Sequence, residues 1–436
     1  MIKVMCHGTF DLLHIGHIKH LEEAKKHGDH LVVSVTSDRF VNKGPKRPYF
    51  SEAHRMEALK GLSFVDEVVL SDSELAVDVI EQVKPNVFVK GVDYENGENK
   101  FNEEERRALD RVGAALVFTK SEKHSSSEII NQFIWSAEQK DTIEKVKALG
   151  GMATIKEALK QIKEFNISII GEAIIDEYIF VDVNGVSSKK PTLSSTFQYS
   201  QRYEGGSLAV RNHLESFVKS IYYPKYNTRK KIVKTRYIQE DKHLFEVIEG
   251  VNGYWAPHPE VQNDSFDAVI LCDFGHGLFD DQMVKWCSKI KGFVAINCQT
   301  NSSNYGFNLV TKYKDFAFNY LSIDLKEAKL ALHDQKPSNV YNQLKAMIDV
   351  PMSITLGKGG AFVEGQHVPA FADSVVDPMG AGDAYFALTS LLMKLKLDPT
   401  LVGFMGNVFA GLKTKTLGNE PVHYDQFLKA LNYILK

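Results

Sequence analysis

Two histidines at the start of a helix most constrain how this chain can fold. His14 and His17 lie in the segment 8–17, which directly follows the apolar residues 2–6. Residues 18–26 then place apolar side chains on one helical face and charged side chains on the other. A strand that passes through a glycine-containing turn into an amphipathic helix is typical of an open parallel α/β sheet.

The turn formed by residues 8–17 suits phosphate binding. The first turn of a helix has unpaired N–H groups and the positive end of the helix dipole, so it favours anions. The imidazoles of His14 and His17 can donate to phosphoryl oxygens whose charge grows as a bond to pyrophosphate breaks. Glycines in the turn let the backbone approach a ligand closely. The predicted nucleotide-binding residues of this turn are Gly8, Thr9, Phe10 and Gly16.

The same turn resembles the HxGH signature of the nucleotidyltransferase superfamily, and residues 8–11 make it most similar to the cytidylyltransferase-like branch. The resemblance implies that a phosphate oxygen of an acceptor attacks the α-phosphorus of a nucleoside triphosphate and expels pyrophosphate, with Mg²⁺ as cofactor and no covalent intermediate. It implies catalytic roles for His14, His17 and Lys43, and it assigns no residue as a metal ligand. The further nucleotide contacts that it implies are Arg55, Asp93, Ser125, Ser126 and Ser127.

Each of these downstream residues also has a simpler interpretation. Lys43 and Arg55 could be solvated surface charges, and the serines at 125–127 could only cap a helix. The choice of base stays open as well. Residues 8–13 favour CTP, whereas residues 90–94 resemble heptose-phosphate adenylyltransferases and favour ATP.

Beyond the first helix, apolar strands alternate with amphipathic helices. Apolar runs at 31–35, 68–70 and 87–89 are separated by helical patterns at 51–62 and 76–83. This order predicts a doubly wound parallel sheet. Ligands of such sheets bind at the carboxyl ends of the strands, which is where the turn with the two histidines begins.

A charged helical stretch then interrupts the alternation, and a second α/β pattern follows it. We predict a nucleotidyltransferase domain at 1–135, a helical linker at 136–165 and a second domain at 166–436. A chain of 436 residues is too long for one ordinary core, which agrees with this division.

The second domain has its own phosphate-binding pattern at residues 377–384. Gly380, Ala381 and Gly382 expose backbone N–H groups at the start of an apolar helix, where they can form an anion hole for a transferring phosphate. Asp383 beside them can accept a hydroxyl proton as general base. A glycine-rich turn with Asp383 as a helix cap is the simpler alternative.

This pattern resembles the GAGD motif of the ribokinase/PfkB sugar kinases, which implies ATP as phosphate donor. The fold class is therefore predicted to be α/β, with two Rossmann-like doubly wound domains, an HxGH nucleotidyltransferase fold followed by a ribokinase-like fold. The resemblance implies sugar binding by Asp176, Gly205 and Gly206. It implies nucleotide binding by Gly357, Gly359 and Asn407. Residues 234–236 and 273–277 resemble the heptose kinase branch.

The second domain also departs from the sugar kinase pattern. The stretch 207–233 is short, so that a strand and helix beside the sugar are expected to be missing, and Ala209 and Val210 stand where an asparagine is usual. The NxxE element that organises Mg²⁺ would be residues 319–322, which contain no glutamate, and residues 297–301 replace an aspartate-proline-lysine-glycine element. These changes leave a non-catalytic kinase fold open.

Charge and cysteine content limit the partners. The formal net charge of −3 gives no electrostatic indication of nucleic acid or an anionic membrane as a partner. The four cysteines show no CxxC spacing, so neither a zinc site nor a disulfide framework is indicated. With no secretory segment or membrane-spanning apolar run in the sequence, we expect a cytoplasmic protein.

The pairing of domains resembles the bifunctional ADP-heptose biosynthesis enzymes with the domain order reversed. Our main hypothesis is a bifunctional, homo-oligomeric enzyme that makes a nucleotide-activated sugar for surface polysaccharides, using a sugar or polyol phosphate and CTP or ATP. One alternative is a monofunctional glycerol-phosphate-type cytidylyltransferase whose kinase-like domain is structural. Another is a scaffold that binds nucleotide without turnover. The acceptor, and whether the two reactions are consecutive, stay open.

Overall fold

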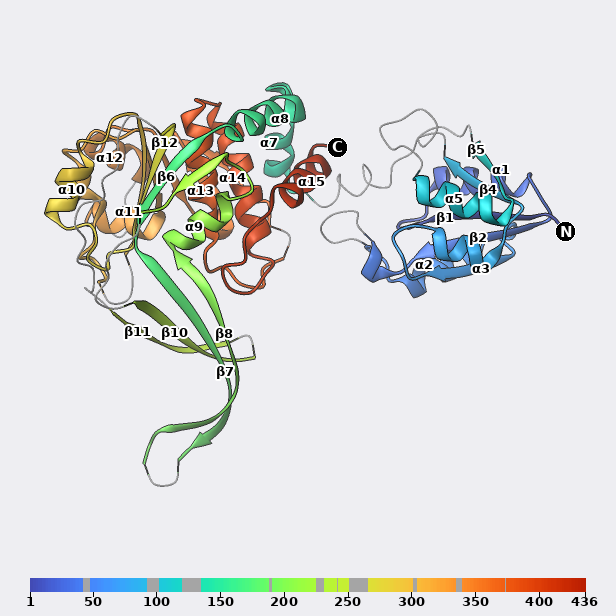
Figure 1. The fold of residues 1–436 in the computed structure, drawn as a ribbon, viewed down its shortest axis with the longest axis horizontal. Helices are drawn as coiled ribbons and strands as arrows, with labels where there is room; N and C mark the ends of the chain where they lie inside the picture. Colours follow the sequence, from blue (N-terminus) through green and yellow to red (C-terminus); the bar gives the residue numbers. More distant parts are fainter. Residues whose placement is uncertain are drawn as a thin grey trace. The chain divides into compact units, whose positions relative to one another are not determined.

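The computed structural model describes two compact units. The described residues are 1–41, 48–91, 102–119, 135–187, 190–224, 231–240, 242–250, 266–300, 304–334, 339–372 and 374–436. The units comprise Met1–Trp135 and Ser136–Leu435. Their elements are drawn in Figure 1.

The first unit is built on a five-stranded parallel sheet with the order β3-β2-β1-β4-β5. Its strands are β1 (Lys3–Gly8), β2 (His30–Thr36), β3 (Glu67–Ser71), β4 (Val87–Gly91) and β5 (Ala115–Thr119). Its helices are α1 (Ile15–Lys25), α2 (Glu52–Lys60), α3 (Val77–Val83) and α5 (Glu103–Val112), with the short 3-10 helix η1 (Asp38–Phe40).

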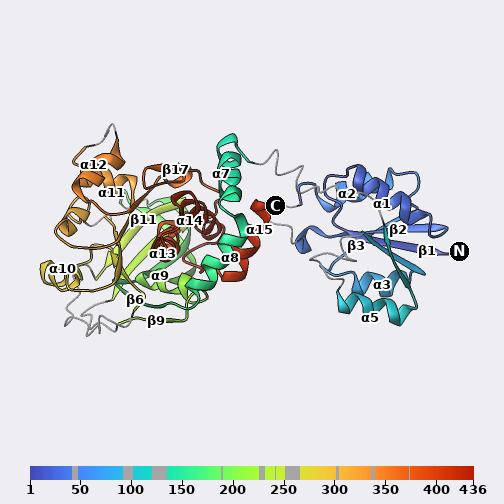
Figure 2. The same ribbon diagram turned by 90° about the horizontal axis from the view of Figure 1, so that it is seen from above.

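Both faces of this sheet are covered. Cys6 of β1 packs in a core with Leu21 of α1 and Leu59 of α2. The neighbouring Met5 points to the other face, into a core with Ile80 of α3 and residues of α5. Figure 2 shows α1 and α2 on one side of the strands and α3 and α5 on the other. The doubly wound fold is confirmed, and the strand order reverses between β1 and β4, beside the end of β1 where the HxGH turn starts.

The second unit contains an eight-stranded sheet with the order β17-β16-β15-β14-β13-β12-β6-β9. Its strands are β6 (Asn166–Gly171), β9 (Ser220–Tyr222), β12 (Ala268–Asp273), β13 (Phe293–Cys298), β14 (Tyr320–Asp324), β15 (Met352–Thr355), β16 (Ala361–Val363) and β17 (Gln366–Val368). The strands from β9 to β15 pair in parallel, and β16 and β17 continue the sheet antiparallel.

Helices cover both faces of this larger sheet. They are α7 (Ala137–Ala148), α8 (Gly151–Ile162), α9 (Ser207–Leu214), α10 (Asp281–Cys287), α11 (Leu325–Ala331), α12 (Val340–Met347), α13 (Ala381–Lys394), α14 (Pro399–Lys413) and α15 (Tyr424–Leu435), with the 3-10 helices η2 (Val310–Tyr313) and η3 (Gly357–Gly359). Residues of α10, α11 and α12 share one core with the sheet. The helix α13 contacts β12, β13 and β14 and packs against α14 and α9. In its described residues, the short stretch 207–233 contains the helix α9, the strand β9 and the start of the strand that begins at Ile232.

A separate four-stranded sheet, here called the lid sheet, has the order β11-β10-β7-β8. Its strands are β7 (Ala173–Val186), β8 (Leu193–Gly206), β10 (Ile232–Gln239) and β11 (Lys242–Glu249). Within the second unit, β7 and β8 form a long hairpin that extends away from the eight-stranded sheet (Figure 1).

The segment that we predicted to be a linker is helical and packs within the second unit. Ser136 and Gln139 form a capping box at the start of α7, and Ile143, Val146 and Ile155 are buried. The Gln139 side chain donates to the carbonyl oxygen of Ala370 at 2.6 Å. Because α7 and α8 bury an apolar face, they are part of the second unit's fold. No helix in the described ranges is long and apolar enough to cross a membrane.

Candidate functional site

The first candidate site is the HxGH turn between β1 and α1. His14 is the residue before α1, and the N–H of Gly16 donates to its Nδ1 at 3.1 Å. A neutral imidazole whose Nδ1 accepts carries its proton on Nε2, so this contact orients an Nε2–H donor. The rings of His14 and His17 stack with centroids 3.9 Å apart and planes 26° apart. The two imidazoles therefore form one unit at the start of a helix, as the sequence predicted.

Packing beneath the turn holds His17. The Phe10 side chain is buried and meets the His17 ring edge to face, with centroids 5.4 Å apart. Phe10 has a φ of 50°, an unusual backbone conformation for a bulky residue. A Cβ atom on Gly8 would lie 3.2 Å from the Phe10 ring. Phe10 therefore packs against His17 and the Gly8 backbone lies beside its ring, and the roles of Gly8, Thr9 and Phe10 as nucleotide contacts stay predictions.

Arg55 differs from its predicted role. Its side chain is 1% exposed, and it donates to the carbonyl oxygens of Thr9 at 2.5 Å and Thr36 at 2.8 Å. It also donates to the carbonyl oxygen of Phe50 at 3.0 Å and to the carboxylate of Asp38 at 2.7 Å. We correct its assignment from a nucleotide ligand to a positioning residue, because this guanidinium joins the ends of β1 and β2 to the start of α2.

Asp11 completes this framework, and we had given it no role. Its carboxylate is buried and accepts the N–H groups of Tyr49 at 2.8 Å and Phe50 at 3.0 Å. Phe50 is thereby fixed to the turn through its N–H by Asp11 and through its carbonyl by Arg55. Of the other predicted residues of this site, Lys43, Asp93, Ser125, Ser126 and Ser127 lie outside the described residues.

The second candidate site is the loop that leads into α13. Gly380 is the residue before α13 and has a φ of 77°, and Ala381 and Gly382 begin the helix. A Cβ atom on Gly380 would lie 2.2 Å from Oδ1 of Asn419, so only glycine fits there. The predicted anion hole thus lies at the first turn of a 14-residue helix, but the N–H of Ala381 already donates to the carbonyl oxygen of Pro378 at 3.2 Å.

Asp383 lies in the first turn of α13 and is almost fully buried. Burial raises the pKa of Asp383 to about 6, and the hydrogen bond from Gln299 opposes that rise. Nε2 of Gln299 donates to Oδ1 of Asp383 at 2.7 Å. An aspartate with this pKa is ionised near neutral pH and can accept a proton. Gln299 lies in the segment that replaces the usual kinase element, and we had not assigned it a role.

The predicted sugar-binding aspartate is held by two donors. Arg236 on β10 donates to Oδ1 of Asp176 at 2.5 Å, and Asn419 donates to Oδ2 at 2.7 Å. A Cβ atom on Gly205 would lie 2.0 Å from Oδ2 of Asp176, which explains the glycine. Gly206 has a φ of 61° and precedes α9. The structure thus brings Asp176, Gly205 and Gly206 together, but both carboxylate oxygens already have partners.

The structure bears on the segment that we assigned to the NxxE element. Asn319 lies at the amino end of β14, away from the edge where the sites form, and its Oδ1 accepts the N–H of Val294 at 2.8 Å. At the carboxyl end of β14, Asp324 and Glu327 form a capping box that has the same spacing as the NxxE element. Burial, followed by the neighbouring carboxylates of Asp324 and Asp383, raises the pKa of Glu327 to about 8. Glu327, five residues beyond the segment that we assigned, thus has the spacing from Asp324 that the glutamate of an NxxE element has from its asparagine.

Glu172 is a further residue that the sequence did not reveal. It is fully buried and accepts the N–H groups of Phe274 at 2.6 Å, His276 at 2.8 Å and Leu278 at 3.0 Å. It fixes the loop that includes the segment resembling the heptose kinases. Burial raises the pKa of Glu172 to about 7, and the nearby Asp273 contributes to the rise.

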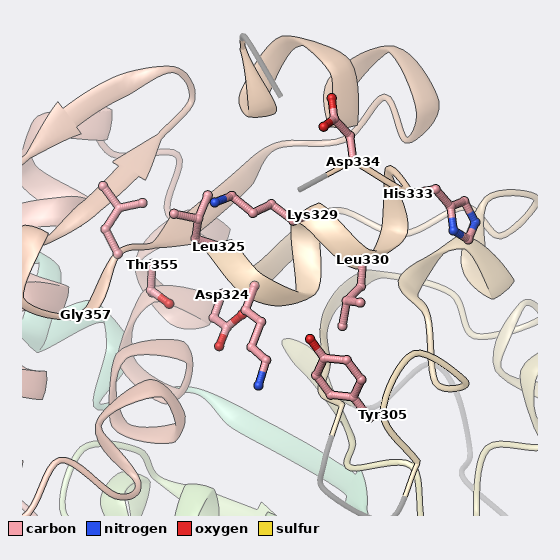
Figure 3. A pocket seen from close by; sticks show the side chains of 11 residues that line it. Tyr305, Asp324, Leu325, Lys329, Leu330, His333, Asp334, Thr355 and Gly357 are labelled. Atoms are coloured by element: carbon pink, nitrogen blue, oxygen red, sulfur yellow. The ribbon is translucent and has the colours of Figure 1, made fainter. Parts of the chain in front are cut away.

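A cavity of about 680 Å³ lies along α11. It is lined by Tyr305, Asp324, Leu325, Lys326, Lys329, Leu330, His333, Asp334, Thr355, Leu356 and Gly357. Figure 3 shows Asp324, Thr355 and Gly357 at one end and His333 at the other. Lys326 places its ammonium 4.7 Å from the centre of the Tyr305 ring. Gly357 thus lines a cavity large enough for a nucleotide, with two lysines beside it.

Asn407 does not have the role that we predicted. It is buried, and its amide group donates to the carbonyl oxygens of Val368 at 2.9 Å and Pro369 at 3.0 Å. Both donors of the side chain are therefore used to hold the end of β17. We correct Asn407 to a positioning residue. Gly359 lies in η3 beside Gly357.

The described ranges contain no cluster of three or more His, Cys, Asp or Glu side chains able to hold a metal ion. Mg²⁺ usually binds through one or two carboxylates together with substrate phosphates. Asp324 is exposed and lines the cavity, so its carboxylate fits that mode of binding.

The first unit's sheet order and its paired histidines at the strand reversal define an α/β domain of the nucleotidyltransferase class. The cytidylyltransferase-like family model matches residues 5–132. Over 136 residues the chain is 38% identical to an FAD synthase from Ferroglobus placidus, covering 31% of this chain and 89% of that protein. The chain belongs to the cytidylyltransferase-like family.

Further similarities involve shorter or more distant matches. The chain is 47% identical over 93 residues to the bifunctional protein HldE of Geobacter metallireducens, covering 21% of this chain and 19% of that protein. It therefore spans about a fifth of the length of the HldE relatives that it matches. Among solved structures, a ribokinase from Thermotoga maritima is 15% identical, covers 62% of this chain and 99% of that chain, and gives a TM-score of 0.47.

Proposed function

We propose that this chain is a bifunctional enzyme of nucleotide-activated sugar biosynthesis. Its first unit transfers a nucleotidyl group from CTP or ATP to a sugar or polyol phosphate and releases pyrophosphate. Its second unit phosphorylates a sugar with ATP. The observation that carries the proposal is the stacked pair of His14 and His17 at the start of α1, beside the strand reversal of a parallel sheet.

At the first site, the histidines act by stabilising charge. The N–H of Gly16 fills Nδ1 of His14, which leaves the proton on Nε2 to be donated to an α-phosphoryl oxygen. As the bond to pyrophosphate breaks, this donor and the N–H groups of the first helical turn offset the growing negative charge. Asp11 and Arg55 hold the turn in place, so little reorganisation is needed during the reaction.

At the second site, Asp383 takes the proton of the attacking hydroxyl, and Gln299 orients its carboxylate. The N–H groups of Gly380 and Gly382 receive the transferred phosphoryl group, since the N–H of Ala381 donates to Pro378. Mg²⁺, when bound, neutralises phosphate charge, and Asp324 is the carboxylate placed to hold it. The cavity that includes Gly357 is the proposed nucleotide site.

One observation favours a second candidate function. Arg236 and Asn419 occupy both oxygens of Asp176, so a sugar hydroxyl would have to compete with them. In that case the chain is a monofunctional nucleotidyltransferase acting on polyol phosphates, and the second unit is structural.

The decisive experiment measures pyrophosphate release with CTP and with ATP against a panel of sugar and polyol phosphates. We expect His14→Ala and His17→Ala to lose at least about 100-fold in turnover, because each removes a donor to the developing charge. The exposed His27→Ala is the matched control and should retain activity. Near-normal turnover by either site variant would contradict the proposal. A second assay measures phosphorylation of sugars by the whole chain. Activity that is abolished in Asp383→Asn supports the bifunctional hypothesis, and no activity in the wild type supports the monofunctional one.

We also propose that the chain self-associates through the lid sheet. The edge strands β8 and β11 expose Phe197, Tyr199 and Phe245, side chains that are usually covered. Light scattering of the whole chain and of Phe245→Lys tests this. Four free, buried cysteines support a reducing compartment such as the cytoplasm.

A further inference from the structure

A lysine lies fully buried behind the loop that leads into α13. Lys413, the last residue of α14, has no exposed surface, and its Nζ donates to the carbonyl oxygen of Asp377 at 3.3 Å. A Cβ atom on Gly380 would lie 3.3 Å from Cε of Lys413. The side chain therefore runs directly beneath residues 377–380. Burying an ammonium group is costly unless opposite charges compensate it, and the reaction proposed above makes no use of this lysine.

Carboxylates from three elements face Lys413. Burial lowers the pKa of Lys413, whereas Asp377 in the loop, Asp383 on α13 and Asp176 on β7 raise it. His213 on α9 is also close, and burial, together with the charge of Lys413, lowers its pKa to about 3, so it is neutral. Three carboxylates of the second site thus favour the charged form of Lys413 against the effect of its burial.

Asp377 is anchored at the same place by its side chain. Its Oδ2 accepts the hydroxyl of Tyr178 at 2.9 Å and the N–H of Gly418 at 2.9 Å, and its Oδ1 accepts the N–H of Met379 at 3.0 Å. The main-chain N–H of Asp377 donates to the carbonyl oxygen of Thr414 at 3.1 Å, and its main-chain carbonyl accepts from Lys413. Together these bonds fix the backbone from which the N–H groups at 380–382 project.

We infer that Lys413 is an electrostatic positioning residue of the second site. It holds the loop 377–380 against α14, and it keeps a positive charge behind the anion hole and beside Asp383. A phosphoryl group in transfer gains charge at this helix start, and a buried cation acts there through a medium of low dielectric. Lys413 lies behind the loop and does not touch the substrate. The inference rests on the proposed kinase function.

The charges around Asp383 determine how pH should reveal this role. Besides Lys413, Asp383 is faced by Asp176 on β7, Lys234 on β10, Gln299 after β13 and Glu327 on α11, and by the buried thiol of Cys272 on β12. Lys413 and Lys234 favour ionised Asp383, whereas burial and Asp176 oppose it. Removing the Lys413 charge should therefore move the titration of Asp383 to higher pH.

The test compares Lys413→Met, which keeps the unbranched side chain but is one atom shorter and uncharged, with Lys413→Arg, which keeps its charge. We expect Lys413→Met to lower kcat for ATP-dependent phosphorylation by about 100-fold, with a smaller change in the KM of the sugar. The acidic limb of kcat/KM, expected near pH 6 from Asp383, should rise by roughly one pH unit. Lys413→Arg should recover part of the rate and leave the limb near its original position. The exposed Lys429→Met on α15 is the control.

A second measurement does not depend on activity. Lys413→Met should speed hydrogen exchange of the amides at 379–384, measured on the whole chain, while the exchange of β1 and pyrophosphate release stay unchanged. A folded Lys413→Met with wild-type exchange, or with wild-type kcat and an unmoved acidic limb, would overturn the inference. If the wild-type chain phosphorylates no sugar while the exchange still responds, the kinase proposal fails and the positioning role of Lys413 stands. If Lys413→Met does not fold, the test depends on Lys413→Arg. A reduced kcat with the acidic limb of kcat/KM at its wild-type pH supports the inference. An acidic limb shifted to higher pH despite the retained charge contradicts it.

Discussion

Replacing Arg55 by methionine should destabilise the first unit. The guanidinium is buried and donates hydrogen bonds to three carbonyl oxygens. The bonds to Thr9 and Thr36 are buried, and the bond to Phe50 is partly buried. Methionine fills much of the same space but donates nothing. Asp38 is 41% exposed, so water can replace the arginine there. The two buried carbonyls at β1 and β2 are left without a donor.

The size of the effect follows from these two acceptors. A buried polar group without a partner costs about 1–3 kcal/mol, so the expected loss is about 2–6 kcal/mol. A domain typically has only about 5–15 kcal/mol of stability, so Arg55→Met should remove a large share of it. Arg39→Ala is the matched control. Its ion pair with Asp72 is largely exposed, and its loss should change stability by less than about 1 kcal/mol.

The assay is hydrogen exchange of β1 and α1 in increasing urea, with β12 and β13 of the same chain as internal reference. The free energy of unfolding of the first unit should fall, and that of the second unit should not. If Arg55 were instead a phosphate ligand, Arg55→Met would reduce pyrophosphate release and leave the exchange of β1 as in the wild type. That result would refute the positioning role.

Two further predictions concern the second unit. Gly205→Ala should reduce sugar phosphorylation by at least about tenfold, because the new Cβ would lie 2.0 Å from Oδ2 of Asp176. Pyrophosphate release by the same variant should be unaffected. The control in both assays is Gly61→Ala, where the atom nearest to the new Cβ is 3.4 Å away. The melting temperature of the second unit should fall between pH 5 and 8, and should fall less in Glu327→Gln. The folded pKa of Glu327, about 8, lies above an unfolded value of about 4.3, so its contribution is complete below the unfolded pKa and is lost as the pH rises through 8. An equally steep fall in Glu327→Gln would show that this carboxyl does not contribute.

The features that the sequence predicted correctly are local ones. The HxGH turn and the loop before α13 are each defined by consecutive residues at a strand–helix junction, so their conformation follows from glycine positions and helix starts. The alternation of strands and helices likewise gave the doubly wound sheet of the first unit.

The features that the sequence could not provide depend on where distant segments meet. Arg55 was assigned to the nucleotide, because nothing near it in the chain shows that the ends of β1 and β2 close over it. Asn407 was assigned to the nucleotide, but its donors are taken by the end of β17. Glu327 was given no role because the sequence alone did not show where β14 ends, and the pair Asp324 and Glu327 begins at that end.

The two sites differ in how they use their charged residues. In the first, Arg55 is committed to the protein, and our proposal gives the histidines the surface that a phosphate meets. In the second, Asp176 is committed as well, to Arg236 and Asn419, although it is the predicted acceptor ligand. A hydroxyl of an acceptor sugar therefore has to donate to Oδ1 of Asp176 alongside the Arg236 guanidinium, or to displace the Asn419 amide from Oδ2. A carboxylate oxygen accepts more than one hydrogen bond, so sharing requires less rearrangement than displacement. A productive acceptor should then bind beside Arg236, and if none does, the second unit is a structural support for the first.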